Sequence, residues 1–318
     1  MRMLHKEHEV HLFSLTENQP SEAAQKAISQ VSQSFRWHKM SSIKRALRLF
    51  FAVFSTRPFQ THWFYQRSAD NQLHDWMNEL KPDVIYCQLI RMAEYVRNDH
   101  HTPRVLDYMD TLSAGMKSRS NLRPFWSRWI FRLEANRLAH YESVIFDYFD
   151  GQTIISAADR KLIAHPGRKS IEVIPNGVDS DFFKSKPSDR QAEFSESHGI
   201  GDSNHFVILF TGNMSYPPNV DAAKRLVNEI LPQVQTPGVR ILIAGTQPTA
   251  EVQKLASETV TVTGWVPDLR HAYEQADLFV APLRIGTGQQ NKILEAMSMS
   301  LPCITSTHVM NGIPKTGN

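Results

Sequence analysis

The stretch HFVILFTG, residues 205–212, decides the fold. It is a short apolar run rich in β-branched and aromatic residues, it ends at a glycine, and such a run is typical of a strand buried on both faces. Comparable runs follow at 239–245 (VRILIAG), 260–266 (VTVTGWV) and 277–283 (DLFVAPL), with helical segments between them. Buried strands that alternate with helices of about ten residues predict an α/β fold with a parallel, doubly wound sheet.

The first half of the chain alternates in the same way. Apolar runs at 8–15, 82–89 and 104–110 are expected to form strands. Two or three helices are expected within 41–80, and a long amphipathic helix over 127–146. This alternation predicts a second Rossmann-like sheet covered by helices.

The boundary between the two predicted domains lies after the strand IEVIPNGVD, residues 171–179. A polar, loop-rich stretch follows at 184–204. We therefore expect an N-terminal Rossmann-like domain over 1–176 and a C-terminal one over 177–318. Two such domains would face each other across a cleft, which is a common site for a ligand.

Composition excludes several classes of protein. The 318 residues carry a formal net charge of +3, which is too small to indicate binding to nucleic acid. The chain's two cysteines, Cys87 and Cys303, and its fourteen histidines match no metal spacing, so we predict no metal and no cofactor. The start of the chain has no apolar signal segment, and a reduced, cytoplasmic location is expected.

The segment GTGQQNKILEAMSMSLPCITS, residues 286–306, predicts a phosphate-binding turn. Gly286 and Gly288 let backbone amides approach an anion closely. The helix expected from about Gln289 adds free N–H groups and the positive end of its dipole. Thr287 lies between the two glycines.

Three charged residues accompany this turn. Lys292 and Arg284 are candidates for neutralising a diphosphate leaving group, whose charge develops most in the transition state. Glu295 can accept hydrogen bonds from two hydroxyl groups. The alternatives are a simple surface pair of Lys292 and Glu295, and an ordinary loop cation at Arg284.

A family resemblance rests on four motifs in order: IPNGVDSDFF, FTGNMSYPPNVDA, GWVPDLRHAYEQADLFVAPLRIGTG and KILEAMSMSLPCITS. Together they resemble retaining glycosyltransferases of family 4, which have the GT-B fold, and most of all the bacterial exopolysaccharide-type sugar transferases. The resemblance implies metal-independent transfer of a sugar, with retention, from a nucleotide-diphospho-sugar to a polysaccharide or lipid-linked acceptor.

The resemblance also implies roles for single residues of the C-terminal domain. Many relatives carry two glutamates in the donor site. Glu295 matches the second, which would bind the ribose hydroxyls, whereas Thr287 stands where the first would be. The loop after the first strand, with Gly212 and Asn213, lacks the cations that many relatives place there. The loop around Val266 is expected to influence donor selectivity.

In the N-terminal domain, relatives often carry a polar residue after about the fourth strand. Asp107 and Asp110 are the candidates here, and Asp110 is expected to position or stabilise the reacting groups rather than to act as a nucleophile. The alternative for Asp110 is a helix cap. The DSD sequence at 179–181 resembles a metal-binding motif of another fold, but a turn is the preferred interpretation.

Two expectations concern the membrane and the chain ends. The segment 42–54 has an amphipathic pattern, and we expect it to pack within the N-terminal domain. The alternative is an interfacial helix that contacts the inner membrane surface.

By family standards the chain is expected to be incomplete at both ends. The alternative to the glycosyltransferase is therefore a non-catalytic remnant that binds nucleotide or nothing. A nucleotide-sugar epimerase of similar two-domain shape is a separate alternative.

Overall fold

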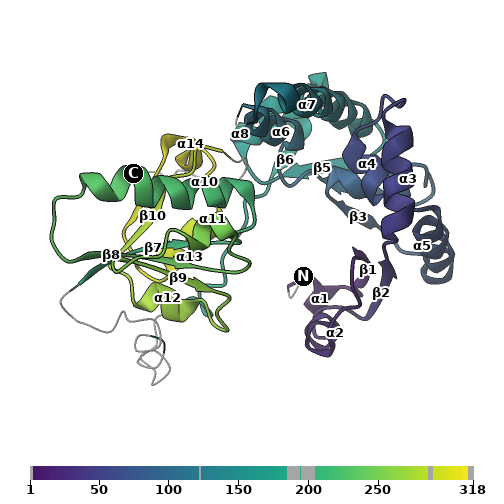
Figure 1. Cartoon of the computed structure of the whole chain (residues 1–318). Coiled ribbons are helices and arrows are strands. Elements are labelled where there is room, and N and C mark those ends of the chain that lie inside the picture. Colours follow the sequence, from purple (N-terminus) through teal and green to yellow (C-terminus); the bar gives the residue numbers. More distant parts are fainter. Residues whose placement is uncertain (1–2, 122, 185–193, 195–204, 286–288, 314–318) are drawn as a thin grey trace. The chain divides into compact units, whose positions relative to one another are not determined.

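The structure is a computed structural model that describes residues 3–121, 123–184, 194, 205–285 and 289–313. The chain divides into two compact units, coloured along the sequence in Figure 1. Unit 1 contains residues 1–154 and 161–172, and unit 2 contains residues 155–160 and 173–318.

Unit 2 contains a five-stranded sheet in which each pair of neighbouring strands is parallel. The strand order is β11-β10-β7-β8-β9. The strands are β7 (Phe206–Thr211), β8 (Val239–Ala244), β9 (Val260–Gly264), β10 (Leu278–Ala281) and β11 (Cys303–Thr305). The expected parallel α/β sheet is therefore present.

Helices cover both faces of this sheet, and α10 and α12 lie on opposite faces (Figure 1). The helices are α10 (Pro217–Arg225), α11 (Ala250–Gln253), α12 (Arg270–Glu274), α13 (Asn291–Ser298) and α14 (Thr307–Met310). A π-helical turn, Leu226–Ile230, and a 3₁₀ turn, Leu231–Gln233, continue α10.

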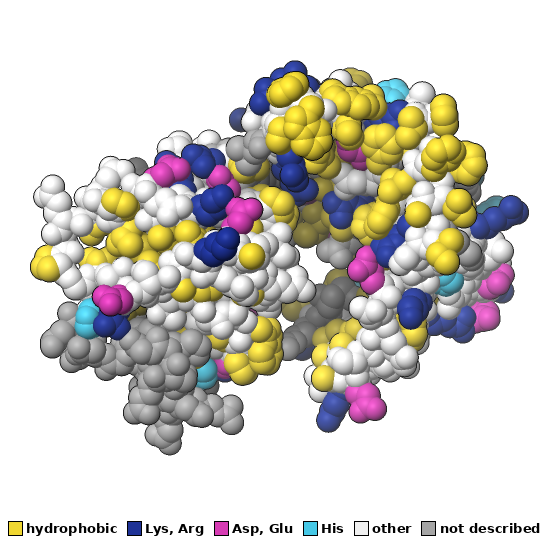
Figure 2. All heavy atoms as spheres, viewed as in Figure 1, with side chains coloured by type: hydrophobic (Ala, Val, Ile, Leu, Met, Phe, Trp, Pro, Cys, Tyr) yellow, Lys and Arg dark blue, Asp and Glu magenta, His cyan; other side chains and the backbone are white. Residues whose placement is uncertain are grey.

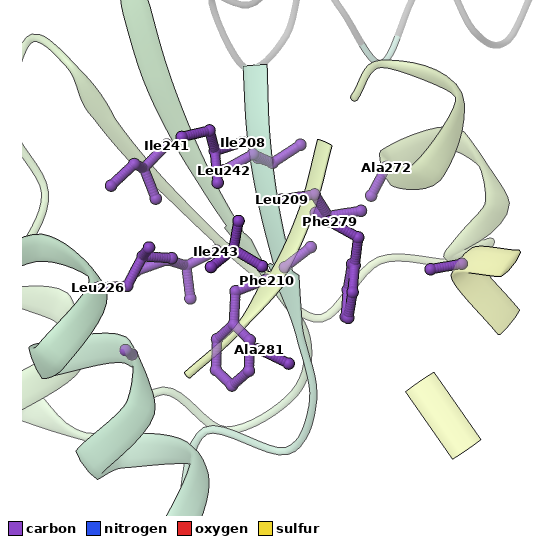
Figure 3. Close-up of a cluster of buried hydrophobic side chains, with 14 of the residues drawn as sticks. Ile208, Leu209, Phe210, Leu226, Ile241, Leu242, Ile243, Ala272, Phe279 and Ala281 are labelled. Carbon is purple, nitrogen blue, oxygen red and sulfur yellow. The ribbon is translucent and has the colours of Figure 1, made fainter. Parts of the chain in front are cut away.

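The core of unit 2 explains why its strands read as continuous apolar runs. Leu209, Phe210, Leu242, Ile243 and Phe279 are fully buried, and their side chains gather on both faces of the strands in the close-up of Figure 3. A strand covered by helices on both faces cannot alternate polar and apolar residues without burying polar groups.

Helix α10 begins before its best capping residue, Asn219. It starts at Pro217 with Tyr216 as its N-cap, although asparagine is a favoured N-cap residue. Proline is favoured in the first turn of a helix because its missing N–H would be unpaired there in any case. Asn219 thus lies inside the first turn, where it is buried.

Unit 1 contains two sheets. In the first, β1 (His11–Thr16) pairs with β2 (Ser34–Lys39) in parallel. In the second, four strands follow chain order: β3 (Ile85–Gln88), β4 (Arg104–Asp107), β5 (Gly151–Ile154) and β6 (Glu172–Val173). The strand expected over 171–179 is thus only two residues long, and β2 was not predicted.

The helices of unit 1 include the expected group within 41–80 and the expected long helix. They are α1 (Leu4–Glu7), α2 (Glu22–Ser29), α3 (Ser42–Ala52), α4 (Phe59–Phe64), α5 (Arg67–Leu80), α6 (Leu112–Ser120) and α7 (Phe125–Phe146), with 3₁₀ helices at Ile90–Tyr95 and Pro166–Ser170. Helix α8 (Ala157–Leu162) spans the boundary between the units. None of the described helices combines the length and apolar character needed to cross a bilayer.

Two glycines at the carboxyl ends of β7 and β8 are in unusually close contact. Gly212 and Gly245 have φ angles of +152° and +143°, in a region of backbone conformation that residues with a Cβ rarely adopt. A Cβ on Gly245 would lie 1.9 Å from the carbonyl oxygen of Gly212, which is far inside van der Waals contact. The two loops can therefore converge only if residue 245 is glycine.

The substitution Gly245→Ala should destabilise unit 2, since the new methyl group must displace backbone atoms and the residue must also keep a strained φ. We expect a loss of about 3 kcal/mol in the free energy of unfolding, measured by thermal or chemical denaturation. Gly151→Ala is the matched control, because a Cβ there would meet Val105 at an ordinary 3.6 Å. Equal stability of the two variants would contradict this account.

Candidate donor-binding site

The strand order of unit 2 creates a switch point between β7 and β10. From β7 the chain proceeds to β8 and β9 on one side, whereas β10 leads to β11 on the other side. The loops that leave the carboxyl ends of β7 and β10 therefore diverge, and ligands of open α/β sheets bind at such a point. Gly212 follows β7, and Lys292 on α13 follows β10.

Lys292 is the central side chain at this point. Its Nζ donates a hydrogen bond to Oδ1 of Asn219 at 2.6 Å and lies 4.7 Å from the ring centroid of the buried Phe210. Burial lowers the pKa of Lys292 to about 8, although the nearby Glu295 carboxylate raises it. An anion bound beside this ammonium group would restore the charge that burial disfavours.

Gly212 provides the space that Lys292 occupies. A Cβ at residue 212 would lie 2.7 Å from Nδ2 of Asn219 and 3.0 Å from Nζ of Lys292. The Asn219 amide is itself held in place, because its Nδ2 donates to the carbonyl oxygen of Asn213 at 2.9 Å. The predicted residues Gly212, Asn213 and Lys292 are thus brought together, with Asn219 as the link between them.

Glu295 lies one turn further along α13 than Lys292 and is half-buried. Its Oε2 accepts a hydrogen bond from the hydroxyl of Tyr273 at 2.8 Å, and that hydroxyl also lies 3.0 Å from Oγ1 of Thr211. Burial, together with the Glu295 charge, raises the pKa of Tyr273 above its usual value. Tyr273 therefore remains a proton donor that orients the carboxylate.

The start of α13 is hydrogen-bonded to the segment IEVIPNGVD, residues 171–179, through Asn176. Asn176 donates its backbone N–H to Oε1 of Gln289 at 2.9 Å and its side-chain amide to Oδ1 of Asn291 at 3.0 Å. Gln289 is buried. These bonds fix the residues that directly follow Gly286, Thr287 and Gly288, which lie outside the described residues.

Arg284 has acidic partners in this structure. Its guanidinium group donates to both carboxylate oxygens of Asp221, at 2.7 and 3.1 Å, and Nη1 lies 3.5 Å from Glu229. The hydrogen bond with Asp221 raises the pKa of Arg284 further. Asp221 thus occupies two donor nitrogens of Arg284 and neutralises much of the charge that the arginine could offer a diphosphate.

The remaining candidate of unit 2, Val266, lies after β9 and is partly buried against the core. Asp179, the first residue of the DSD sequence, accepts the backbone N–H of Phe182 at 3.0 Å, as expected of a turn.

No three His, Cys, Asp or Glu side chains of the described residues form a cluster that could bind a metal ion.

In unit 1, Asp107 and Asp110 are close in sequence but differ in their surroundings. Asp107 ends β4 and is buried. It accepts the hydroxyl proton of Tyr86 at 2.8 Å and the backbone N–H of Met109 at 3.0 Å. Asp110 is partly buried and precedes α6, whose N-cap is Thr111 rather than Asp110. The left-handed φ of +61° at Met109 forms the turn between the two aspartates.

A buried carboxylate, Glu142 of α7, lies at the N-terminus of α6. It accepts the backbone N–H of Ser113 at 2.9 Å and the Ser113 hydroxyl at 2.5 Å. Burial raises the pKa of Glu142 to about 7, with a further contribution from the charge of Asp110, although the bonds from Ser113 oppose this shift. Protonation of Glu142 is therefore linked to the region of the candidate Asp110.

Sequence reasoning missed four residues that hold the site in unit 2: Asn219, Thr211, Tyr273 and Gln289. Each of them contacts a partner that lies far away in sequence, so local patterns do not reveal its role. Asn219 and Tyr273 lie in helical segments that also carry charged residues, so their polarity gave no distinguishing signal.

Comparison with known proteins supports the predicted class. Residues 205–317 match the family model described as "Glycosyl transferases group 1". This segment contains β7 to β11 and all the candidate residues of unit 2. No curated protein sequence matches the chain.

Several solved structures have a similar fold. A structure of HepE from Anabaena in complex with UDP and glucose has a TM-score of 0.65 at 13% identity, over 94% of this chain and 81% of that one. A glycosyltransferase from Rickettsia africae has a TM-score of 0.59 at 11% identity, over 94% and 79%. Sucrose-phosphate synthase from Thermosynechococcus elongatus has a TM-score of 0.57 at 16% identity, over 75% and 59%. The predicted fold class is confirmed, and the prediction of a glycosyltransferase is supported.

The raised pKa of Glu142 predicts a pH-dependent stability. Between the unfolded pKa of about 4.5 and the folded pKa of about 7, the folded protein binds the extra proton, so this group's contribution to the free energy of unfolding falls as pH rises. We expect the difference between the wild type and Glu142→Gln to change by about 2–3 kcal/mol from about pH 5 to about pH 8.

The measurement is chemical denaturation of both proteins at each pH. All other titrating groups are shared by the two proteins, so their contributions cancel in the difference between the free energies of unfolding of the wild type and the glutamine variant. A difference that stays constant with pH would show that Glu142 is ionised throughout this range.

Proposed function

We propose that this protein transfers a sugar from a nucleotide-diphospho-sugar to an acceptor hydroxyl, with the donor bound by unit 2. The single observation that carries the proposal is the half-buried Lys292 ammonium at the switch point, held by Asn219 and packed against Gly212. The match of residues 205–317 to the group 1 glycosyltransferases supports it.

In this proposal Lys292 neutralises the diphosphate, and the helix start at α13 adds its free N–H groups. Glu295 accepts hydrogen bonds from the ribose hydroxyls, and the hydrogen bond from Tyr273 orients the Glu295 carboxylate. The HepE structure contains UDP, so UDP-sugars are the first donors to test. Arg284 would contribute less charge because it pairs with Asp221, and Gly286, Thr287 and Gly288 would form the phosphate turn.

The reaction replaces the bond between the anomeric carbon and the diphosphate oxygen by a bond to the acceptor oxygen. The leaving diphosphate gains charge in the transition state, and a cation already in place stabilises that charge without reorganisation. We propose that Lys292 fulfils this role without a metal ion and that the anomeric configuration is retained. Asp107 and Asp110 would position the sugar or the acceptor.

The acceptor is proposed to be a polysaccharide or a lipid-linked sugar, as in exopolysaccharide synthesis. This assignment depends on the motif resemblance rather than on the contacts in unit 2. It is tested separately, with lipid-linked and soluble glycans as acceptors, and proton NMR of the product reports whether the anomeric configuration is retained.

The donor site predicts a specific pattern of nucleotide affinity. Lys292→Met should weaken UDP binding about 10- to 100-fold and Glu295→Gln about tenfold, because each removes a charge-assisted hydrogen bond. Lys224→Met is the matched control, since Lys224 is an exposed lysine of α10 that pairs with Glu251 at 2.8 Å. Calorimetry with UDP and GDP measures all four proteins.

Failure of every nucleotide to bind the wild-type chain would overturn the proposal, as would equal losses in the control. For a donor that binds, transfer to an acceptor should persist in EDTA. Loss of transfer in EDTA that added Mg²⁺ restores would contradict the metal-independent mechanism while leaving the donor site intact.

The lowered pKa of Lys292 predicts proton uptake on UDP binding. The diphosphate favours the charged ammonium, so a neutral Lys292 must take up a proton when UDP binds. With a free pKa of about 8, uptake should rise from about 0.2 protons at about pH 7.5 to about 0.9 at about pH 9. Calorimetry in buffers of different ionisation enthalpy measures it, and uptake that does not increase with pH would exclude Lys292 as the titrating contact.

A further inference from the structure

Helix α3 of unit 1 exposes its apolar face to solvent and packs through its basic face. Its apolar side chains recur at helical spacing and are exposed, with Phe54 just beyond its end at 82% exposed. Arg45, by contrast, is buried, where it pairs with Glu17 at 2.6 Å and stacks on Trp63 at 4.6 Å. The exposed apolar residues of this segment are Ile43, Leu47, Phe50, Phe51, Val53 and Phe54.

The segment 42–54 was expected to pack within the N-terminal domain. It does so, but most of its apolar side chains are exposed. The basic face provides the contacts instead: Arg48 stacks on Tyr65 at 4.9 Å, in addition to the contacts of Arg45. The phenylalanine rings contact one another, with Phe50 5.5 Å from Phe51 and 6.4 Å from Phe54 between ring centroids.

The first half of α7 has a second exposed apolar stripe. Phe125 is 85% exposed and Trp126 67% exposed. The second half of the same helix is buried, through residues such as Leu138 and Ile145. The exposed stripe consists of Phe125, Trp126, Trp129, Ile130 and Leu133. We call the exposed apolar residues of α3 and α7 together the aromatic face.

The two helices are joined to each other. Arg137 of α7 donates to the carbonyl oxygens of Ala52 and Val53, at 3.0 and 3.2 Å, and thereby satisfies the C-terminal end of α3. The buried Glu134 of α7 accepts the backbone N–H groups of Phe59 and Gln60 at the start of α4. These contacts connect α3, α4 and α7 within unit 1, and Figure 2 shows hydrophobic side chains gathered over α3 and α7.

The two segments that carry the aromatic face contain only basic charges, although two of their arginines pair with carboxylates from elsewhere in unit 1: Arg45 with Glu17 and Arg57 with Glu94. Segments 42–57 and 112–133 together contain nine Lys and Arg residues and no Asp or Glu, whereas the whole chain has 35 basic and 32 acidic residues. Lys117, Arg123 and Arg132 are exposed near the α7 stripe. Figure 2 shows Lys and Arg side chains among the hydrophobic ones over these helices.

We propose that the aromatic face docks on the surface of an anionic phospholipid bilayer. Exposed Trp and Phe side chains insert at the boundary between headgroups and acyl chains, while cations beside them bind the anionic headgroups. A second copy of this chain fits less well. A two-fold interface would bring the same positive segments against each other, with no carboxylate in either segment to pair with them.

This inference goes beyond the proposed function and does not depend on it, because docking needs no donor or acceptor. It would bring the protein to lipid-linked acceptors if these are its substrates. It also provides the partner for the apolar residues of α3, whose exposure would otherwise be unfavourable in water.

The test is co-sedimentation of the full chain with vesicles of phosphatidylcholine alone and of an equal mixture of phosphatidylcholine and phosphatidylglycerol. The wild type should bind the anionic vesicles, and Phe54→Ser with Trp126→Ser should weaken binding at least about tenfold. Trp265→Ser is the matched control, since Trp265 of unit 2 is also 67% exposed. It should bind like the wild type.

A second pair of variants tests the charge. Lys117→Glu with Arg132→Glu should weaken binding to the anionic vesicles by more than about fivefold for each residue and reduce its dependence on salt. Circular dichroism and thermal denaturation establish that each variant is folded.

Three results would overturn the proposal. The first is a wild type that binds neither vesicle, and the second is equal binding by the aromatic variant and the wild type. The third is a dimer in sedimentation equilibrium that the Phe54 and Trp126 substitutions disrupt, because that result would assign the aromatic face to a second copy.

Discussion

The contact between the backbones of Gly212 and Gly245 is the constraint on which the rest of unit 2 depends. It lets the loops after β7 and β8 converge at the carboxyl edge of the sheet. The same absence of a side chain at Gly212 leaves room for Asn219 and for the Lys292 ammonium. Two missing Cβ atoms thus determine both the packing of the loops and the position of the charge.

Much of unit 2 could be predicted because its strands are buried on both faces. A strand such as β7 is apolar at nearly every position, so its sequence clearly predicts a buried strand. The glycines that follow β7 and β8 indicate the carboxyl edge of the sheet, where the candidate site lies. The spacing of Lys292 and Glu295 was enough to put both on one side of α13. The structure adds that the Glu295 carboxylate accepts a hydrogen bond from Tyr273.

The failures have physical causes that sequence patterns do not contain. Asn219 is a good capping residue, but two prolines before it start the helix earlier and turn its amide toward Lys292. Arg284 was interpreted from its distance to the glycine turn, whereas its partner Asp221 comes from a different helix. The pattern of α3 reveals two faces but not which one is inward, and the arginine contacts with Glu17 and Trp63 decide that choice.

The half-buried Lys292 amine also allows the site to be probed with a chemical reagent before any substrate is known. A lysine with a pKa of about 8 is about half unprotonated at about pH 8, whereas an exposed lysine near its usual pKa is less than about one per cent unprotonated. Only the neutral amine is a nucleophile. Lys292 should therefore react with an acylating reagent small enough to reach it, and protection of Lys292 by an added nucleotide would show that the nucleotide binds beside it.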